Sequence, residues 1–319
     1  MNASLHDHFG GWQCPLWEPE PRRFNCPNTE WRRYETPYST PDARHALSKH
    51  GTHRTIFFVG DSLMGQSTGA FTCRVLRDAH KQNASSTLTT TRKPPWSALL
   101  SSSPGGACQP FCHEVSTHDS SITACYVAAG TNYRGCNARA SDAAAALAGH
   151  FIARRGDLIF FNEGLWHKTV NVSSTNLETI IADLTGKAGV LQSLMRSRGI
   201  GLAWRETSPQ HFATQADGSY KTQSWYHDKR CGPHAVTERA PKRDELLARL
   251  EAAGLPVLRI WGATESQWDQ HLEQKTAHTR RKAGADCTHF CQPSGVMEAW
   301  VDGTLLLAER MLHSLKHTW

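Results

Sequence analysis

Long apolar runs are missing from this sequence, and their absence argues against a membrane-spanning helix. A spanning helix needs about 20 consecutive apolar residues, and no such run occurs in the 319 residues. The start, Met1 to His8, has no apolar segment of the kind that a signal peptide requires. A hydrophobic content of 39% and a mean hydropathy of -0.51 are typical of a soluble protein. The length favours one large α/β domain over two small ones.

The sequence also has no dense basic run interleaved with aromatic residues and no nucleic-acid-binding motif. We therefore expect no nucleic-acid partner. The net charge of +6, with 18 histidines to add to it in a mildly acidic compartment, fits a solvated surface that tolerates anionic glycans.

Paired C-x-x-C motifs are absent, although the chain has ten cysteines. An even number spread along the chain favours disulfides over zinc. The alternative is a metal site at Cys108-x-x-x-Cys112 with His113, which is the weaker interpretation. Sequons at Asn2, Asn83 and Asn171 fit a secretory route. An oxidising lumen is the predicted compartment.

The stretch 55–63 is the strongest local signal in the chain. A β-branched and aromatic run predicts a buried strand that ends at Val59, and Gly60 permits a tight turn after it. Ser62 then lies where a strand ends and a helix begins, which is where open α/β sheets bind ligands. This place suits a nucleophile, and the alternative interpretation of Ser62 is a helix N-cap.

A base for this nucleophile is predicted near the other end of the chain. His289 can take the hydroxyl proton of Ser62, and Asp286 can fix its tautomer. Three residues apart, both side chains point the same way on a turn or a first helical turn. The alternative interpretation of His289 is a polar surface residue.

Four motifs occur in order along the chain: F-V-G-D-S-L-M, F-N-E-G-L-W-H, W-R-E-T-S-P-Q-H-F and D-C-T-H-F-C-Q-P-S-G-V-M-E-A-W. Together they resemble the plant trichome-birefringence-like polysaccharide O-acetyltransferases, within the PC-esterase and SGNH/GDSL group. The resemblance covers roughly residues 10–315 and is thinnest over 80–150. It implies an SGNH-like three-layer α/β/α sandwich with a parallel sheet. Members usually carry an N-terminal membrane anchor, so a truncated chain or incomplete gene model is expected.

The resemblance also implies roles for residues that follow the predicted strands. An oxyanion hole would combine the turn amides of Gly60, Asp61 and Ser62 with the Asn162 amide, and Gly164 would allow close substrate approach. From the residues alone, Asn162 reads as a turn or cap residue.

Five further residues are expected to bind substrate: Trp166, His167, Arg205, Ser208 and His211. Trp166 suits stacking on a sugar ring, although a half-buried core tryptophan is equally ordinary. Arg205 can hold a sugar or acyl oxygen, with a structural salt bridge as the alternative. The family's arginine and asparagine after the serine are replaced by Gly65 and Gln66, so substrate contacts from these positions are not expected.

The disulfide pairing cannot be deduced from spacing. The resemblance implies Cys14–Cys73, Cys231–Cys287 and Cys26–Cys291, which leaves Cys108, Cys112, Cys125 and Cys136 to pair among themselves. Two of these bonds would clamp the His289 segment.

The chain divides into an N-terminal segment and a catalytic domain. Residues 1–54 are expected to wrap the domain formed by 55–319, pinned by disulfides. Residues 80–140 read as a loop-rich insertion because of their Ser/Thr clusters, Pro and Gly. Strands are predicted at 158–161, 200–204 and 257–261 and helices at 63–76, 143–149 (capped by Ser141 and Asp142), 177–195, 244–253 and 296–315.

These expectations point to transfer of an acetyl group to a glycan hydroxyl through an acyl-enzyme on Ser62. No metal or bound cofactor is expected, and the donor is acetyl-CoA or an intermediate supplied by a membrane protein. The main alternative is a carbohydrate acetylesterase with the same triad. A non-catalytic glycan-binding protein on this fold is the alternative from another class. The predicted location is the Golgi lumen or outside the cell.

Overall fold

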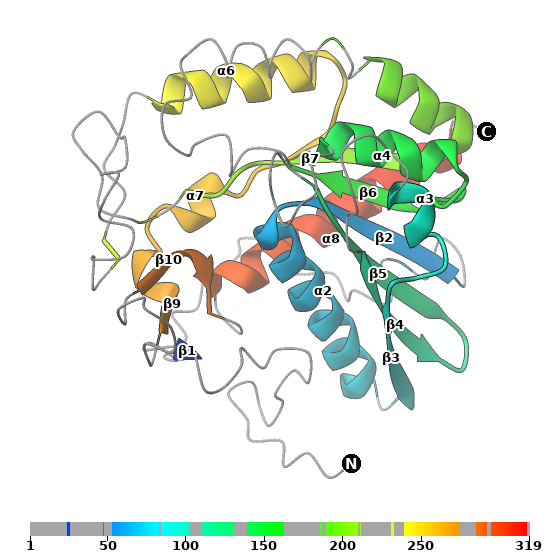
Figure 1. Ribbon diagram of the computed structural model, residues 1–319, viewed down its shortest axis with the longest axis horizontal. Helices are drawn as coiled ribbons and strands as arrows, with labels where there is room; N and C mark the ends of the chain where they lie inside the picture. The colour runs from blue at the N-terminus through cyan, green and yellow to red at the C-terminus, as the bar shows by residue number, and fades with distance from the viewer. Residues whose placement is uncertain are drawn as a thin grey trace.

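The fold is described from a computed structural model of the chain. The structure describes residues 24–25, 47, 53–82, 84–101, 110–129, 139–162, 186, 189–209, 211, 231–232, 239–274, 285–291 and 295–317. Within these residues the chain forms a large mixed sheet with helices on both faces and a small antiparallel sheet beside it (Figure 1).

The large sheet has seven strands in the order β3-β4-β5-β2-β6-β7-β8. Its centre is β2 (His53–Gly60), which pairs in parallel with β5 (Ser121–Ala128) on one side and β6 (Leu158–Phe161) on the other. β7 (Gly201–Arg205) and β8 (Val257–Leu258) continue the parallel part. Because the chain builds outward on both sides of β2, the carboxyl end of β2 is a topological switch point, the usual ligand site of such sheets.

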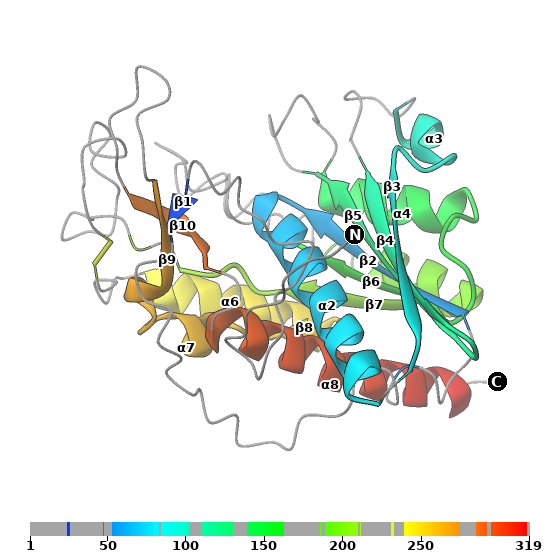
Figure 2. The same ribbon diagram turned by 90° about the horizontal axis from the view of Figure 1, so that it is seen from below.

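Two hydrophobic cores cover the two faces of this sheet. Alternation along β2 sends Ile56 and Phe58 to one core and Phe57 and Val59 to the other. The first core contains α2 (Ser62–Lys81) and α8 (Gly295–His317), and the second contains α4 (Ala140–Gly149), the helix at 189–198 and α6 (Arg239–Ala252). Figures 1 and 2 show α2 and α8 on one side and α4 on the other. The predicted three-layer α/β/α arrangement is therefore present.

The small sheet has the order β1-β9-β10 and is antiparallel. β1 (Phe24–Asn25) comes from the N-terminal segment, and β9 (His271–Gln274) and β10 (Ala285–Phe290) come from the other end of the chain. Both views place it beside the first turn of α2 (Figures 1 and 2). Of the proposed wrap at 1–54, the structure describes only β1, Leu47, and His53 and Arg54 at the start of β2. The rest of the wrap and its predicted disulfides lie outside the described residues.

The loop-rich interpretation of 80–140 is wrong for much of that segment. It contains β3 (Ser86–Arg92), the short helix α3 (Ser97–Ser101), β4 (Phe111–Thr117) and β5. β3 and β4 pair antiparallel at one edge, so the sheet is mostly but not wholly parallel. Threonine is β-branched and suits an exposed edge strand, so the Thr-rich run of β3 forms a strand rather than a loop.

Three predicted boundaries also need correction. α4 begins at Ala140 after Arg139, so Ser141 and Asp142 lie inside its first turn and do not cap it. β8 ends at Leu258 instead of continuing to 261, because Glu206 Oε2 accepts main-chain N–H groups of Ile260 and Trp261, each at 2.8 Å, where α7 (Trp261–Thr264) begins. Of the helix predicted at 177–195, residues 177–185 lie outside the described residues, and the chain is helical at 189–198.

None of the helices within the described ranges is long and apolar enough to cross a bilayer.

Candidate active site

Ser62 is the first residue of α2 and follows directly from the central strand. Asp61 is the N-cap of α2, and its Oδ1 accepts the main-chain N–H of Leu63 at 2.9 Å. The alternative interpretation of Ser62 as the N-cap is therefore wrong, and its hydroxyl is available for another partner. Because the strand ends and the helix begins at this point, Ser62 lies at the positive end of a 20-residue helix.

The partner of the Ser62 hydroxyl is His289. Ser62 Oγ and His289 Nε2 are 2.6 Å apart across 227 residues of sequence. Both residues are half-buried, so the pair is reachable from solvent. A serine that donates a hydrogen bond to a histidine is the arrangement that activates a hydroxyl as a nucleophile.

No protein-family model matches this chain, and neither does any curated protein. The family resemblance of the four motifs thus stays a prediction.

Gly60 sets the close approach of β2 and β6 under the nucleophile. Its φ is +153°, and a Cβ added there would lie 2.7 Å from the main-chain oxygen of Asn162 and 2.8 Å from Met64 Cγ. Since both neighbours are buried, they have little room to move. Only glycine fits this position without a shift of the β2–α2 turn.

Gln66 docks the histidine segment onto α2. Its Nε2 donates to the main-chain oxygen of Phe290 at 2.9 Å, and its Oε1 accepts the Phe290 N–H at 3.2 Å. The buried Gln66 amide thus takes the place of a neighbouring strand for one residue of β10. Phe290 follows His289, so this contact places the base over the first turn of α2. The sequence marked Gln66 only as a departure from the family pattern, which gave no sign of this role.

Asn162 lies at the end of β6, as predicted, but its amide is engaged inward. Its Nδ2 donates to the main-chain oxygen of Arg205 at 2.7 Å and to Thr207 Oγ1 at 2.9 Å. Only 1% of the residue is exposed. In this structure Asn162 ties the ends of β6 and β7 together, as its turn-residue interpretation suggested, and it reaches an oxyanion only by releasing Thr207.

Asp61 and Arg205 are both buried next to the site, and their opposite charges act on one another. Burial raises the pKa of the Asp61 carboxyl, opposed first by the positive charge of Arg205 and then by the Leu63 N–H and His289. Burial lowers the pKa of the Arg205 guanidinium to about 10, against the opposing charges of Asp61 and Glu206. The guanidinium carbon lies 4.2 Å from the centre of the Trp300 ring, a favourable cation–π geometry.

Arg205, Ser208 and His211, which were predicted to contact substrate, are buried in this structure. Their exposed fractions are 1%, 0% and 0%. They lie at the carboxyl end of β7 as predicted, but they belong to the layer beneath the site. Within the described part of the chain, Arg205 Nε, Arg205 Nη2 and Ser208 Oγ have no hydrogen-bond partner.

For the remaining predicted site residues, the structure describes the backbone of Asp286 alone. Asp286 is in β10 and pairs with Leu272, so the predicted turn or helical turn is wrong. Its side chain is not among those described. The pairing of β10 with β9 is irregular between Asp286 and Phe290. Gly164, Trp166 and His167 are outside the described residues.

Two of the expected disulfides are present. Cys231–Cys287 is the pair that the resemblance implied, and it anchors β10 two residues before His289. Cys112–Cys125 crosses β4 and β5, which fits local pairing and removes Cys112 from the alternative metal site. Cys73 and Cys291 are also disulfide-bonded. Their predicted partners, Cys14 and Cys26, lie outside the described residues, as do Cys108 and Cys136.

A cavity of about 240 Å³ lies elsewhere, lined by Gly201, Leu202 and Met311 among others. Gly201 is the first residue of β7, whereas Ser62 follows the last residue of the parallel strand β2. The cavity therefore lies at the amino ends of the parallel strands, whereas the Ser62–His289 pair lies at their carboxyl ends.

Proposed function

We propose that this chain is an acyl-transfer enzyme that moves an acetyl group to a glycan hydroxyl through a covalent intermediate on Ser62. The observation that carries the proposal is the 2.6 Å contact between Ser62 Oγ and His289 Nε2 at the switch point of the sheet. The acetyl group and the glycan acceptor come from the resemblance of the four sequence motifs.

In the first half of the reaction, Ser62 Oγ attacks the carbonyl carbon of the acetyl donor while His289 takes the hydroxyl proton. The negative charge that develops on the carbonyl oxygen is stabilised by the main-chain N–H of Ser62 and the positive end of α2. The bond to the donor's leaving group then breaks, and His289 returns the proton to that group. The product is an acetyl ester of Ser62.

In the second half, a sugar hydroxyl attacks the ester carbonyl and gives its proton to His289. The bond between the acetyl carbon and Ser62 Oγ breaks, and the proton returns to Ser62. Asp286 is the proposed orienter of His289, because a base acts best when a third group fixes its tautomer. Trp166 and His167 remain proposed substrate contacts.

The disulfides support a compartment that is oxidising. We place the reaction in the secretory pathway, with the Golgi lumen or the cell exterior as its site. The polysaccharide and the donor, whether acetyl-CoA or an intermediate held by a membrane protein, are part of the proposal.

The test is to incubate the purified protein with p-nitrophenyl acetate and a mixture of neutral and anionic oligosaccharides. Acetylated oligosaccharide, formed by the wild type but not by Ser62→Ala, is the expected result. Free acetate with no acetylated sugar would instead assign the chain to the acetylesterases. Equal product formation by wild type and Ser62→Ala would remove Ser62 from the mechanism, and no product above a blank without protein would leave only a non-catalytic role.

A further inference from the structure

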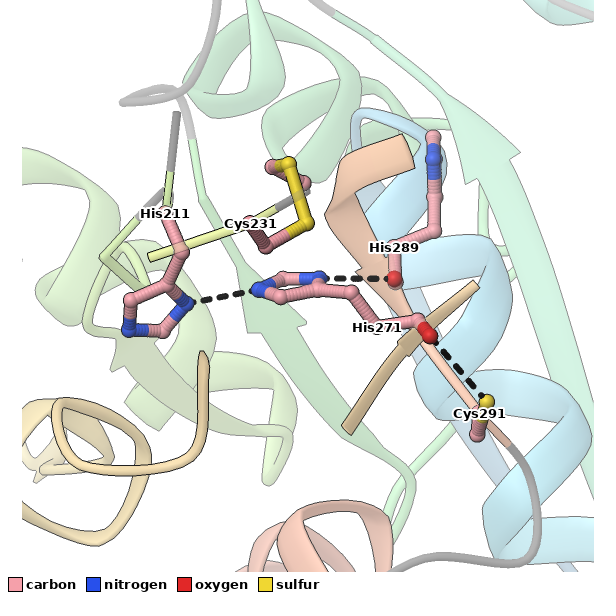
Figure 3. The surroundings of a disulfide bond; sticks show 6 residues. His211, Cys231, His271, His289 and Cys291 are labelled. Atoms are coloured by element: carbon pink, nitrogen blue, oxygen red, sulfur yellow. Dashed lines mark hydrogen bonds between the residues drawn. A yellow bond between two sulfur atoms is a disulfide. The ribbon is translucent and has the colours of Figure 1, made fainter. Parts of the chain in front are cut away.

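Two buried histidines face one another directly behind the proposed base. His211 follows β7, His271 begins β9, and their exposed fractions are 0% and 2%. His211 Nδ1 and His271 Nε2 are 2.6 Å apart (Figure 3). This separation is within hydrogen-bond distance, so one of these two nitrogens must donate to the other.

The outer nitrogen of each ring is opposite a main-chain carbonyl. His271 Nδ1 is 2.8 Å from the oxygen of His289, and His211 Nε2 is 3.0 Å from the oxygen of Glu265. A carbonyl oxygen only accepts, so both outer nitrogens carry a proton. A neutral imidazole has one ring proton, which these two bonds already use. With neutral rings, the inner nitrogens would be two acceptors 2.6 Å apart, and they would repel.

We propose that His211 and His271 share a third ring proton, and hence one positive charge, and that this charged pair is a positioning device for His289. The role of His289 as the base rests on the proposed function, whereas the proton count of the pair does not. One added proton satisfies all three contacts at once, and any neutral arrangement loses one of them.

The surroundings favour a cation at this place despite its burial. The His271 and Phe290 rings are 4.1 Å apart between centroids and tilted by 30°, which is close enough for a cation–π contact. Two carbonyl dipoles point at the pair. Other titratable side chains lie in or next to these elements: Glu265 after α7, Arg205 at the end of β7, Glu206 after it, and His289 in β10, which interacts with the charge of Asp61.

The pair acts on His289 in two ways. Its N–H holds the His289 carbonyl where β10 departs from regular pairing with β9, between Asp286 and Phe290. Figure 3 shows the His289 ring directed away from His271, so the carbonyl is fixed while the ring is left to meet Ser62. The positive charge also disfavours an imidazolium at His289, which keeps this ring neutral and able to accept the serine proton.

The first test counts ring protons by NMR in the unmodified protein, with ¹⁵N-labelled histidine at neutral pH. The expected result is three ring N–H protons for the two residues, with a through-hydrogen-bond coupling between His211 Nδ1 and His271 Nε2. Two ring protons in total would overturn the proposal. The count needs no activity, so it stands or fails separately from the acyl-transfer function.

The second test is the pH dependence of the rate in two variants that keep the outer bonds. In His271→Asn the Nδ2 takes the place of Nδ1 opposite His289, and in His211→Gln the Nε2 takes the place of the ring Nε2 opposite Glu265. Either change removes the shared proton. We expect the acid limb of the rate profile with p-nitrophenyl acetate to move upward by on the order of half to one pH unit in both variants.

The direction follows from the sign of the charge, because loss of a nearby cation raises the pKa of His289 and protonates the base at higher pH. A purely structural role predicts no shift for His211→Gln, since the bond to the His289 carbonyl comes from His271; that result would overturn the proposal. If the wild type has no serine-dependent activity, the acyl-transfer function fails, and the proton count alone decides this inference.

Discussion

Ser62 and His289 meet at one point, but they are held there by different kinds of structure. Ser62 is fixed by regular backbone elements, a central strand and a 20-residue helix with a core on each face of the sheet. His289 is in a six-residue strand of a small sheet, and individual side-chain contacts place it. Those contacts come from Gln66, His271 and the Cys231–Cys287 disulfide.

The difference has a consequence for mutation. A secondary-structure element distributes its stability over many contacts, so the position of Ser62 tolerates the loss of any one surface contact. A segment held by a few specific bonds loses its geometry when one of them is removed. Small displacements at a reacting pair are costly to rate. We therefore expect the base side of the site to be the sensitive one.

The largest effect is expected from Ser62→Ala. Removing the nucleophile lowers the rate by at least about 10³-fold, while stability changes by less than about 0.5 kcal/mol because Asp61, not Ser62, caps α2. Initial rates and thermal unfolding of the same preparation check both parts. A variant that keeps wild-type activity would remove Ser62 from the mechanism.

The two disulfides offer a direct comparison of the two regions. Replacing Cys231 and Cys287 by alanine opens a loop with a sequence separation of 56 and costs about 4 kcal/mol. The matched control, alanine at Cys112 and Cys125, opens one of 13 and costs about 3 kcal/mol. Denaturant unfolding and rates below the transition measure both. Only the first pair is expected to reduce the rate of the folded protein, and equal losses of rate would contradict the comparison.

Gln66→Met tests the docking of β10 on α2 without a large change of volume. It leaves the Phe290 N–H and carbonyl buried and unpaired, which costs about 2–4 kcal/mol, and we expect a rate loss of about 10²-fold. Ser67→Ala is the control, because its buried hydroxyl donates back to the Leu63 carbonyl within the same helix. If both variants lose rate equally, Gln66 has no special part in placing His289.

The smallest effect is expected at the exposed ion pair of Arg259 and Glu251. The side chains are 55% and 43% exposed at an N–O distance of 2.9 Å. Arg259→Ala should lower the free energy of unfolding by less than about 0.5 kcal/mol and leave the rate unchanged. A larger loss in denaturant unfolding would mean that the surface near β8 contributes more than its contacts indicate.

Features with a local signal in the sequence were predicted, whereas features that arise from contacts between distant segments were not. The turn from Val59 to Ser62 was readable because a buried strand, a glycine and a helix start each leave a local signal. His289 was identified through its motif. The burial of Arg205 and His211 was not foreseen, since polar residues after a strand read equally as a site rim or as a layer beneath it.

Two other features had no local signal. His271 is a single histidine in a polar stretch, and its importance arises only when His211, 60 residues away, lies opposite it. The Thr-rich strand β3 has an exposed pattern without apolar alternation, so its composition resembled a loop. Its pairing with β4 is a tertiary effect that the local sequence does not contain.

Ser62 is proposed to carry the acyl group, and mass spectrometry after incubation with an acetyl donor and no acceptor tests this directly. We expect one added acetyl group on the peptide that contains Ser62, lost in Ser62→Ala and formed more slowly in His289→Ala. An acetyl group that remains on the protein in Ser62→Ala, or no added mass at Ser62 while the protein still transfers acetyl groups, would contradict it.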